Sequence, residues 1–501
     1  MSRAPLLRWL LAVTVLSGPG AVLRAQCPDG TPPPCAGQRA PGPARNSIAV
    51  LYFDNLSRDS GDVYLADGLT EEIIVRLQHV QRLDVKSRYE VRRFQGTRIA
   101  DARSVGRELR VAYLVTGSVR PSPTRMRVSY ELVRTSDGRA LVSDIVDTTA
   151  ADPWAISNAV ALAIARQVAG RLAPEERAAL TRGPTRDAQA LDLYRRGVGL
   201  VERGIRSGDQ SLPLAAVTFF AAAVERDSAF ADAWAAMADA YGWSADEWVP
   251  NRWAAERARA AAGRALALDS ASGKAAAWLA FAMMTVDHDW AGAERVLRRS
   301  IVADPRATDG YLQLSLLLTA TGRPADGWAM VEAAWEGDSL NPRLRYYVWS
   351  TLGCAHRFDD LLRWSDRLGE AGPYARFLGY LGTGQTDSAL AYAARSPNTV
   401  NRVMALAAAG RIAEARDSAA ALAARLDSIR ARGSDLYVTP EREALAWAAA
   451  RDPDHAFAAL ERSFAQRTAS NRPYLACDPA FDNLRSDPRY HDLLRRMHLE
   501  P

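Results

Sequence analysis

Small and apolar residues recur on one side of many segments in this 501-residue chain, and residues 290–305 show the pattern most clearly. There Ala293, Leu297, Ser300 and Ile301 follow the i, i+4, i+7, i+8 spacing of a single helical face. The helix should end at Asp304-Pro305, because proline has no backbone N–H to donate and does not fit the next turn. The pattern predicts an amphipathic helix that must bury one face against a neighbour.

The same helix ending recurs along the chain at a nearly constant interval. It is seen at Asp227-Ser228, Asp269-Ser270, Asp304-Pro305 and Asp338-Ser339, and Gly372-Pro373 falls in the same phase. The second residues of these pairs are 42, 35, 34 and 34 positions apart. A period near 34 residues predicts an array of paired helices, in which no pair can bury its apolar face without the next pair.

Residues 47–172 show a different pattern, in which short apolar runs alternate with helical segments. Strands are expected at 47–53, 82–86 and 112–119, with helices at 64–79, 104–109 and 152–172. Apolar and polar residues then alternate over 126–132, which predicts a strand with one solvated face, and Asp137-Gly138 predicts a hairpin turn into a partner strand at 139–148. The expected fold class is α+β: an N-terminal mixed-sheet α/β domain followed by an all-α helical solenoid.

The first 25 residues have the features of a secretory signal peptide. Arg3 and Arg8 come before an apolar run at 9–16, which is far shorter than the ~20 residues that span a bilayer. We therefore expect an exported, periplasmic or secreted protein with no transmembrane span in its mature chain. An uncleaved anchor or a misassigned start remains the alternative.

The four cysteines divide into a close pair and two isolated residues. Cys27 and Cys35 lie in a proline-rich tether at 26–46, where they could form a disulfide in an oxidising compartment or remain free thiols. Cys354 and Cys477 are far from any other cysteine in the sequence, and we expect each to be a small buried residue.

Composition and motifs argue against several kinds of chemistry. The net charge is only +5. Nearly all of the positive charges are arginines, and these are interspersed with acidic residues, so the sequence shows no clustered basic face that would predict nucleic-acid binding. The sequence has no His-Glu-x-x-His zinc pair, no phosphate-binding glycine loop after a strand, no Gly-x-Ser-x-Gly elbow and no kinase catalytic loop. The tight cluster Asp287-His288-Asp289 falls in a turn, where we expect solvation. These observations predict no metal, no cofactor and no enzymatic activity.

Two family resemblances extend this interpretation. The segments IAVLYFDNLS (48–57), YLADGLTEEI (64–73), VGREL (105–109) and YLVTGSVR (113–120) resemble the TolB amino-terminal-type domain. The helical units resemble tetratricopeptide repeats, as in Tyr311, Leu314, Ser315 and Leu318 on one helix and Val331 and Ala334 on the next. The resemblance implies a TolB-like domain at 47–172, a linker at 173–187, repeats at 188–467 and a capping segment at 468–501. Relatives of this kind are often fused to a protein kinase, a nucleotide cyclase or a DNA-binding module, which implies a sensing or docking role here.

The repeat phase also predicts which side chains line the concave face of the array. These are Trp243, Lys274, Asp309, Arg343 and Tyr346. Such faces bind extended peptides or helices of other proteins, although the same positions could be ordinary surface and core. A tryptophan-rich insertion with Trp248 and Trp253 is expected to pack on the array. The sequence thus predicts a non-enzymatic exported adaptor that binds other proteins, with ligand sensing or hydrolysis in the α/β domain as the alternative.

Overall fold

The computed structural model describes residues 43–57, 63–97, 99, 101–122, 125–149, 153–181, 183, 185–207, 209, 211–245, 251–369, 372–431, 440–466 and 472–499. The predicted signal peptide, the Cys27 and Cys35 pairing, most of the proline-rich tether and Trp248 lie outside these residues. No helix in the described ranges is long and apolar enough to cross a membrane.

The N-terminal domain is built on a mixed sheet, as expected. Within the described residues its strands are β1 (Ser47–Val50), β2 (Asp54–Asn55), β3 (Asp84–Val85), β4 (Tyr113–Pro121), β5 (Arg125–Arg134) and β6 (Ala140–Thr149). They lie in the order β3-β1-β4-β5-β6, with β2 paired to β4. β1 runs parallel to both of its neighbours, whereas β4, β5 and β6 are antiparallel. Gly138 has a φ of +73° between β5 and β6, which confirms the predicted hairpin turn.

Helices cover this sheet and supply half of its core. They are α1 (Val63–Gln78), α2 (Arg88–Arg92), α3 (Ala102–Leu109), α4 (Pro153–Ala169) and α5 (Pro174–Thr181). The predicted apolar face of α1, with Leu69, Ile73 and Leu77, is buried in the same core as the α4 face that carries Ile156 and Val160. The expected linker at 173–187 contains α5, whose Leu180 is buried in this core, so α5 belongs to the domain.

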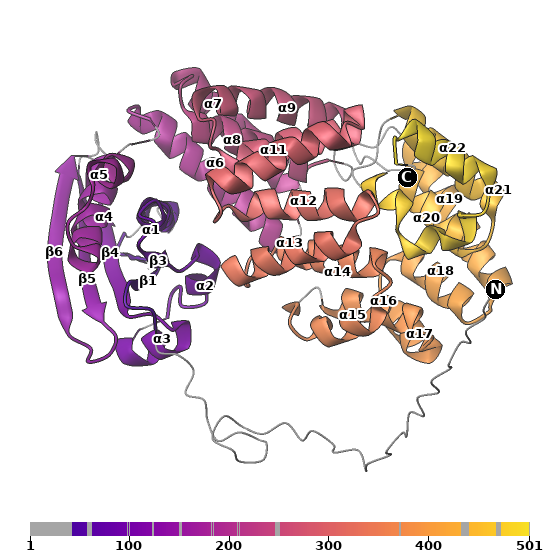
Figure 1. Ribbon diagram of the computed structural model, residues 1–501, viewed down its shortest axis with the longest axis horizontal. Coiled ribbons are helices and arrows are strands. Elements are labelled where there is room, and N and C mark those ends of the chain that lie inside the picture. The colour runs from indigo at the N-terminus through magenta and orange to yellow at the C-terminus, as the bar shows by residue number, and fades with distance from the viewer. Residues whose placement is uncertain are drawn as a thin grey trace, which may run out of the picture.

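A series of helices follows, and each packs against the next (Figure 1). They are α6 (Ala188–Ser207), α7 (Ser211–Arg226), α8 (Ala231–Trp243), α9 (Asn251–Leu268), α10 (Gly273–Ala282), α11 (Trp290–Ala303), α12 (Thr308–Ala320), α13 (Pro324–Gly337), α14 (Leu344–Cys354), α15 (Phe358–Ser365), α16 (Gly372–Gly382), α17 (Thr386–Ala393), α18 (Thr399–Ala408), α19 (Ile412–Ala431), α20 (Pro440–Ala449) and α21 (Pro453–Gln466). The α+β prediction with a helical solenoid is confirmed.

Close helix packing requires small residues in this array. Gly242 on α8 faces the ring of Trp278 on α10, and a Cβ atom at position 242 would lie 1.9 Å from that ring. The first helices of successive pairs are also linked by buried polar contacts. Gln313 on α12 donates to the Tyr347 hydroxyl on α14 at 3.1 Å, and Ser315 lies 3.0 Å from Thr351. These contacts fix the angle between successive units.

The C-terminal segment does more than cover the open end of the array. It contains two short 3-10 helices, Arg472–Ala476 and Pro479–Leu484, and α22 (Pro488–Arg496). Asn483 donates to the carbonyl of Ala448 on α20, as an end cap would. The same segment also returns to the middle of the array, where Trp290 on α11 donates to the Met497 carbonyl at 2.8 Å.

A disulfide joins this segment to the solenoid. Cys354 at the end of α14 is bonded to Cys477, 123 residues away, with 4.8 Å between their Cα atoms. The prediction that these two cysteines are isolated was wrong. Their separation in sequence hides the contact, because only the return of the C-terminal segment to α14 brings them together.

Candidate functional site

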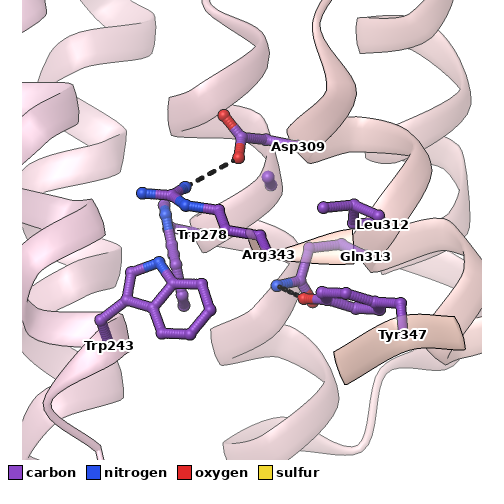
Figure 2. A pocket seen from close by; sticks show the side chains of 8 residues that line it. Trp243, Trp278, Asp309, Leu312, Gln313, Arg343 and Tyr347 are labelled. Atoms are coloured by element: carbon purple, nitrogen blue, oxygen red, sulfur yellow. Dashed lines mark hydrogen bonds and ion pairs between the residues drawn. The ribbon is translucent and has the colours of Figure 1, made fainter. Parts of the chain in front are cut away.

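The residues predicted to line the concave face meet around one guanidinium group. Arg343, at the start of α14, donates to Asp309 on α12 at 2.9 Å (Figure 2) and to Asp239 on α8 at 2.7 Å. Lys274 on α10 lies 3.9 Å from the same Asp239 carboxylate. The array therefore curves tightly enough for α14 to reach α8, three helix pairs earlier.

This charge cluster is buried and remains ionised. Burial opposes ionisation of Asp239, but Arg343 and Lys274 hold the pKa of its carboxyl below the ordinary value. Burial likewise works against the charge of Arg343, yet Asp239 and Asp309 raise its pKa. The side chains of Arg343 and Asp239 are only 5% and 4% exposed. A buried ion pair of this kind is sensitive to the loss of either partner, because the other charge is then left uncompensated.

Aromatic rings surround the cluster and leave two small cavities. The Trp243 ring centre lies 5.1 Å from the Arg343 guanidinium carbon, and its ring meets Trp278 edge-on. A cavity of about 10 Å³ between these rings, Gln313 and Tyr347 has room for a single water (Figure 2). A larger cavity of about 110 Å³ lies next to it. Its lining consists of Gly204, Ile205, Pro213, Trp243, Pro342, Arg343 and Tyr346.

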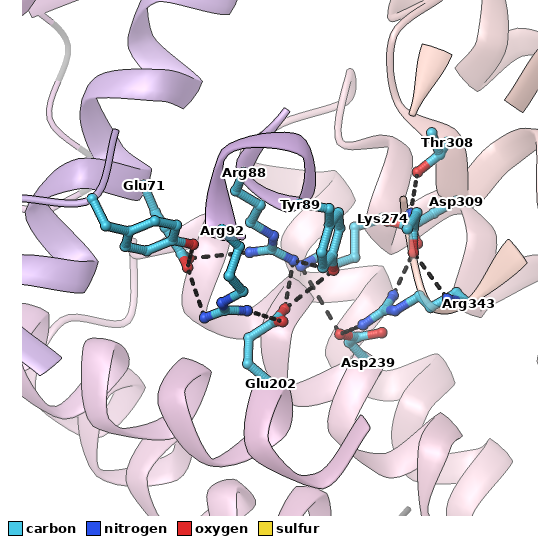
Figure 3. A network of polar contacts seen from close by, with 12 residues as sticks. Glu71, Arg88, Tyr89, Arg92, Glu202, Asp239, Lys274, Thr308, Asp309 and Arg343 are labelled. Carbon is cyan, nitrogen blue, oxygen red and sulfur yellow. Dashed lines mark hydrogen bonds and ion pairs between the residues drawn. The ribbon is translucent and has the colours of Figure 1, made fainter. Parts of the chain in front are cut away.

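Helix α2 of the N-terminal domain lies against this face of the solenoid, on the side of its own domain that is turned toward α13 and α14 (Figure 1). Arg88 and Arg92 contact the Glu202 carboxylate on α6 at 2.6 and 3.3 Å, and the Tyr89 hydroxyl donates to it at 3.3 Å (Figure 3). Burial opposes ionisation of Glu202, but Arg88 and then Arg343 hold its pKa below the ordinary value. Three side chains of one short helix thus converge on a single buried acid.

The network continues from Glu202 into the α/β domain. Glu71 on α1 lies 3.2 Å from Arg88 and 3.7 Å from Arg92, and it accepts a hydrogen bond from the Tyr52 hydroxyl. Polar contacts therefore run without interruption from Tyr52, which lies between β1 and β2, through Glu71 to α6, and Figure 3 shows the part from Glu71 onward.

Three further contacts hold the domain on the solenoid. Ser87, which caps α2, donates to the Asp338 carboxylate at the end of α13 at 2.7 Å. Arg306 donates to the carbonyls of Gln78, Gln81 and Leu83 at 2.8 to 3.1 Å, which caps the end of α1. Arg195 on α6 pairs with Glu72 at 2.5 Å, alongside Gly68. Gly68 on α1 therefore faces the solenoid, and a Cβ atom at this position would lie 3.2 Å from the Arg195 side chain.

Sequence reasoning missed α2, Glu202 and Asp239. One signal was present for α2, because Ser87-x-x-Glu90 is a capping-box pattern and both of its hydrogen bonds form. No comparable signal marked Glu202 or Asp239, since an acid on an amphipathic helix is normally solvated and their arginine partners lie 104 to 114 residues away in sequence.

Other predicted features fall outside this site. Asp287 pairs with Arg259 at 2.6 Å, and Asp289 caps α11 through the Gly292 N–H, so the acid–histidine cluster has structural contacts. Trp253 packs edge-on against Tyr241. In the described ranges, no group of three or more histidine, cysteine, aspartate or glutamate side chains is arranged to hold a metal.

Replacing Glu202 with glutamine tests the contact between α2 and α6. The change leaves two partly buried arginines facing a buried neutral amide, so we expect it to destabilise the chain by about 3 kcal/mol. Urea unfolding followed by circular dichroism would measure the loss. Glu225→Gln on α7, which is exposed, is the matched control and should stay within about 0.5 kcal/mol of the parent. Equal stability of the two variants would contradict the docking geometry.

Asp338 makes the stability of the docked state depend on pH. Burial raises the pKa of its carboxyl to about 6; the Ser87 hydrogen bond and Arg88 oppose this, and Glu90 adds to it. An unfolded aspartate titrates near pH 4, so the folded chain binds more protons between about pH 4 and 6. Asp338 therefore contributes most stability below pH 4, and this contribution is lost as pH rises through 6. The free energy of unfolding would be measured for the parent and for Asp338→Asn at each pH. The difference between the two should fall by up to roughly 3 kcal/mol as the pH rises from about 4 to 6. A flat difference would contradict this assignment.

No family model matches the chain. It is similar to "Putative adenylate cyclase 3" of Rhizobium meliloti (strain 1021), with 37% identity over 164 residues. The matched region covers 32% of this chain and 28% of that relative, so the chain spans little more than a quarter of the relative's length.

This comparison contradicts the expectation that the chain is not an enzyme. A protein that shares more than a third of the residues over the matched region bears the name of an enzyme. The expectation rested on the lack of zinc, phosphate-loop, hydrolase and kinase motifs, and none of those patterns tests for cyclase chemistry. The absence of these motifs was therefore too weak a basis for the conclusion.

Proposed function

We propose that this chain is an exported protein-binding component of a nucleotide-cyclase type of signalling system, built from a TolB-like domain docked on a tetratricopeptide-type solenoid. The observation that carries the proposal is the docking of α2 on the face that holds Glu202 and Arg343. Faces of this kind bind helices of partner proteins, and here the chain's own helix occupies that position.

Two kinds of observation support the family assignments. The 34-residue period coincides with helix pairs that pack through small residues, such as Gly242 against Trp278, as tetratricopeptide repeats do. The similarity to a named cyclase supports the link to nucleotide signalling, because the TolB-like resemblance also implies fusion to such enzymes.

The disulfide supports an exported location. Disulfides such as Cys354–Cys477 persist in oxidising compartments and are rare in the reducing cytosol. The charged and apolar pattern of residues 1–25 points the same way.

Site-specific photo-crosslinking in the producing cell tests the binding role. A photoreactive amino acid at Tyr346, which lines the larger cavity, should give an adduct with one defined partner. The same group at Leu268, which is exposed on α9, is the control and should not give that adduct. Adducts that are equal at both positions, or absent from both, would count against the proposal.

A second candidate function is adenylate cyclase activity, favoured by the name of the relative. Purified chain would be incubated with ATP and either Mg²⁺ or Mn²⁺, and cyclic AMP and pyrophosphate would be measured. Formation of both products in proportion to protein supports this candidate. Their absence with both metals removes it for this chain and leaves the binding role in place.

A further inference from the structure

We infer that α2 is an internal ligand of the solenoid, and that the groove it occupies is a receptor for a partner helix with the same chemistry. That helix would carry two arginines one turn apart with a tyrosine next to the first. The inference rests on the proposed binding function and adds to it the chemical class of the partner.

The charges in the groove require a basic occupant. Among the described residues, the ion pairs of Glu202 are made with Arg88 and Arg92, both of which belong to α2. Asp338 accepts from Ser87 and also faces this helix. Asp239, by contrast, is neutralised within the solenoid by Arg343. Without α2, Glu202 and Asp338 would both face the groove, and an occupant that supplies cations would be strongly preferred.

The contacts of α2 are polar and therefore exchangeable. This helix is only five residues long, and Val91 is its fully buried side chain. Five residues cannot form a stable helix alone, so α2 depends on its cap, on the burial of Val91 in the core of its own domain and on the groove for its structure. An element held this way opens locally at a lower free-energy cost than global unfolding, so a partner with the same groups can replace it.

Competition from the chain itself sets the apparent affinity for such a partner. Because α2 is tethered close to the groove, its effective concentration there is on the order of millimolar. A partner helix must displace α2. The apparent affinity of the partner is therefore its affinity for the open groove multiplied by the fraction of molecules in which the groove is open. Release of α2 by any signal that acts on the α/β domain would raise that affinity without changing the groove.

A peptide-binding experiment on full-length chains tests this inference. The probe is a fluorescein-labelled peptide of residues 84–97, and binding is followed by fluorescence anisotropy. The variant Arg88→Glu/Arg92→Glu releases α2 and should bind the probe about tenfold more tightly than the parent, or better. Adding Glu202→Lys to that variant should abolish binding, and a scrambled probe of the same composition should bind to none of them.

A second measurement uses the parent chain, so the test does not depend on the folding of any variant. Excess unlabelled peptide should speed hydrogen exchange of the backbone amides of residues 88–95, whereas the scrambled peptide should not. Equal probe binding by parent and released variant, binding that survives Glu202→Lys, or unchanged exchange would each overturn the inference.

The two proposals fail in different ways. A partner crosslinked at Tyr346 in cells, combined with no peptide binding, would leave the binding function and remove the internal-ligand inference. Peptide binding by the released variant without any crosslinked partner would leave α2 as an internal ligand of the groove and remove the proposed partner in the cell.

Discussion

Replacing Arg343 with alanine is expected to lower the free energy of unfolding by about 3–5 kcal/mol. The substitution leaves the buried Asp239 carboxylate, and the Asp309 carboxylate that is 21% exposed, without their main cation. It also removes the only direct ion pair described between α8 and α14, so the curvature of the array should relax. Urea unfolding followed by circular dichroism and tryptophan fluorescence would measure the loss.

Two variants serve as controls for this prediction. Arg298→Ala removes an exposed pair with Glu294 on α11 and should cost no more than about 1 kcal/mol. Lys274→Ala should also have a small effect, because its ammonium lies 3.9 Å from Asp239 and is one-third exposed. If Arg343→Ala were no more destabilising than Arg298→Ala, the buried cluster would not hold the array together.

Replacing Cys354 and Cys477 together with serine is expected to destabilise the chain by about 4–5 kcal/mol. The bond closes a loop with a sequence separation of 123 residues, so its loss frees a large part of the unfolded chain. The effect should be concentrated in the C-terminal segment, because apolar packing and hydrogen bonds, such as those of Trp290 and Ser350, are then all that hold it to the array.

Limited proteolysis with mass spectrometry would locate this effect. Residues 472–499 should be cleaved first in the double variant and stay protected in the parent. The matched control is Cys27→Ser/Cys35→Ser, which leaves the bond to α14 intact. Equal protection in all three chains would show that the disulfide is not needed to keep the C-terminal segment in place.

Much of the architecture could be predicted because it depends on local periodicity. The spacing of Ala293, Leu297 and Ser300 predicts the buried face of α11, and each of these residues is buried. The alternation at 126–132 and the glycine at 138 predict the β5–β6 hairpin in the same way. Period and turn chemistry are properties of neighbouring residues, so one sequence is enough to read them.

The features that were missed depend on curvature and on long-range contacts. Asp239 and Arg343 lie 104 residues apart, and they meet because small rotations between successive helix pairs add up over three units. The Cys354–Cys477 bond and the contact of α2 with Glu202 are long-range in the same sense. The five residues predicted to line the groove lie close together in the structure, and their role in partner binding stays a prediction; the sequence could not show that the chain's own helix α2 lies against them.

In the proposed binding role, a partner must compete with α2 for the groove. A solenoid whose concave face is open can bind whatever fits it, whereas here Arg88, Tyr89 and Arg92 already satisfy Glu202. Binding of a partner is then coupled to the position of the α/β domain. On the inference drawn above, a change in the α/β domain that moves α2 would also open the groove of the solenoid.

Cysteine crosslinking between α2 and α13 tests the docked arrangement most directly. Ser87→Cys and Asp338→Cys would be combined in a Cys27→Ser/Cys35→Ser background, because the Ser87 hydroxyl and the Asp338 carboxylate lie 2.7 Å apart. Mild oxidation followed by non-reducing mass spectrometry should show a bond between positions 87 and 338 in nearly every molecule, and neither single variant should form an internal crosslink. A chain that stays unlinked under these conditions while its Cys354–Cys477 bond remains intact would contradict the docking of α2 on the solenoid.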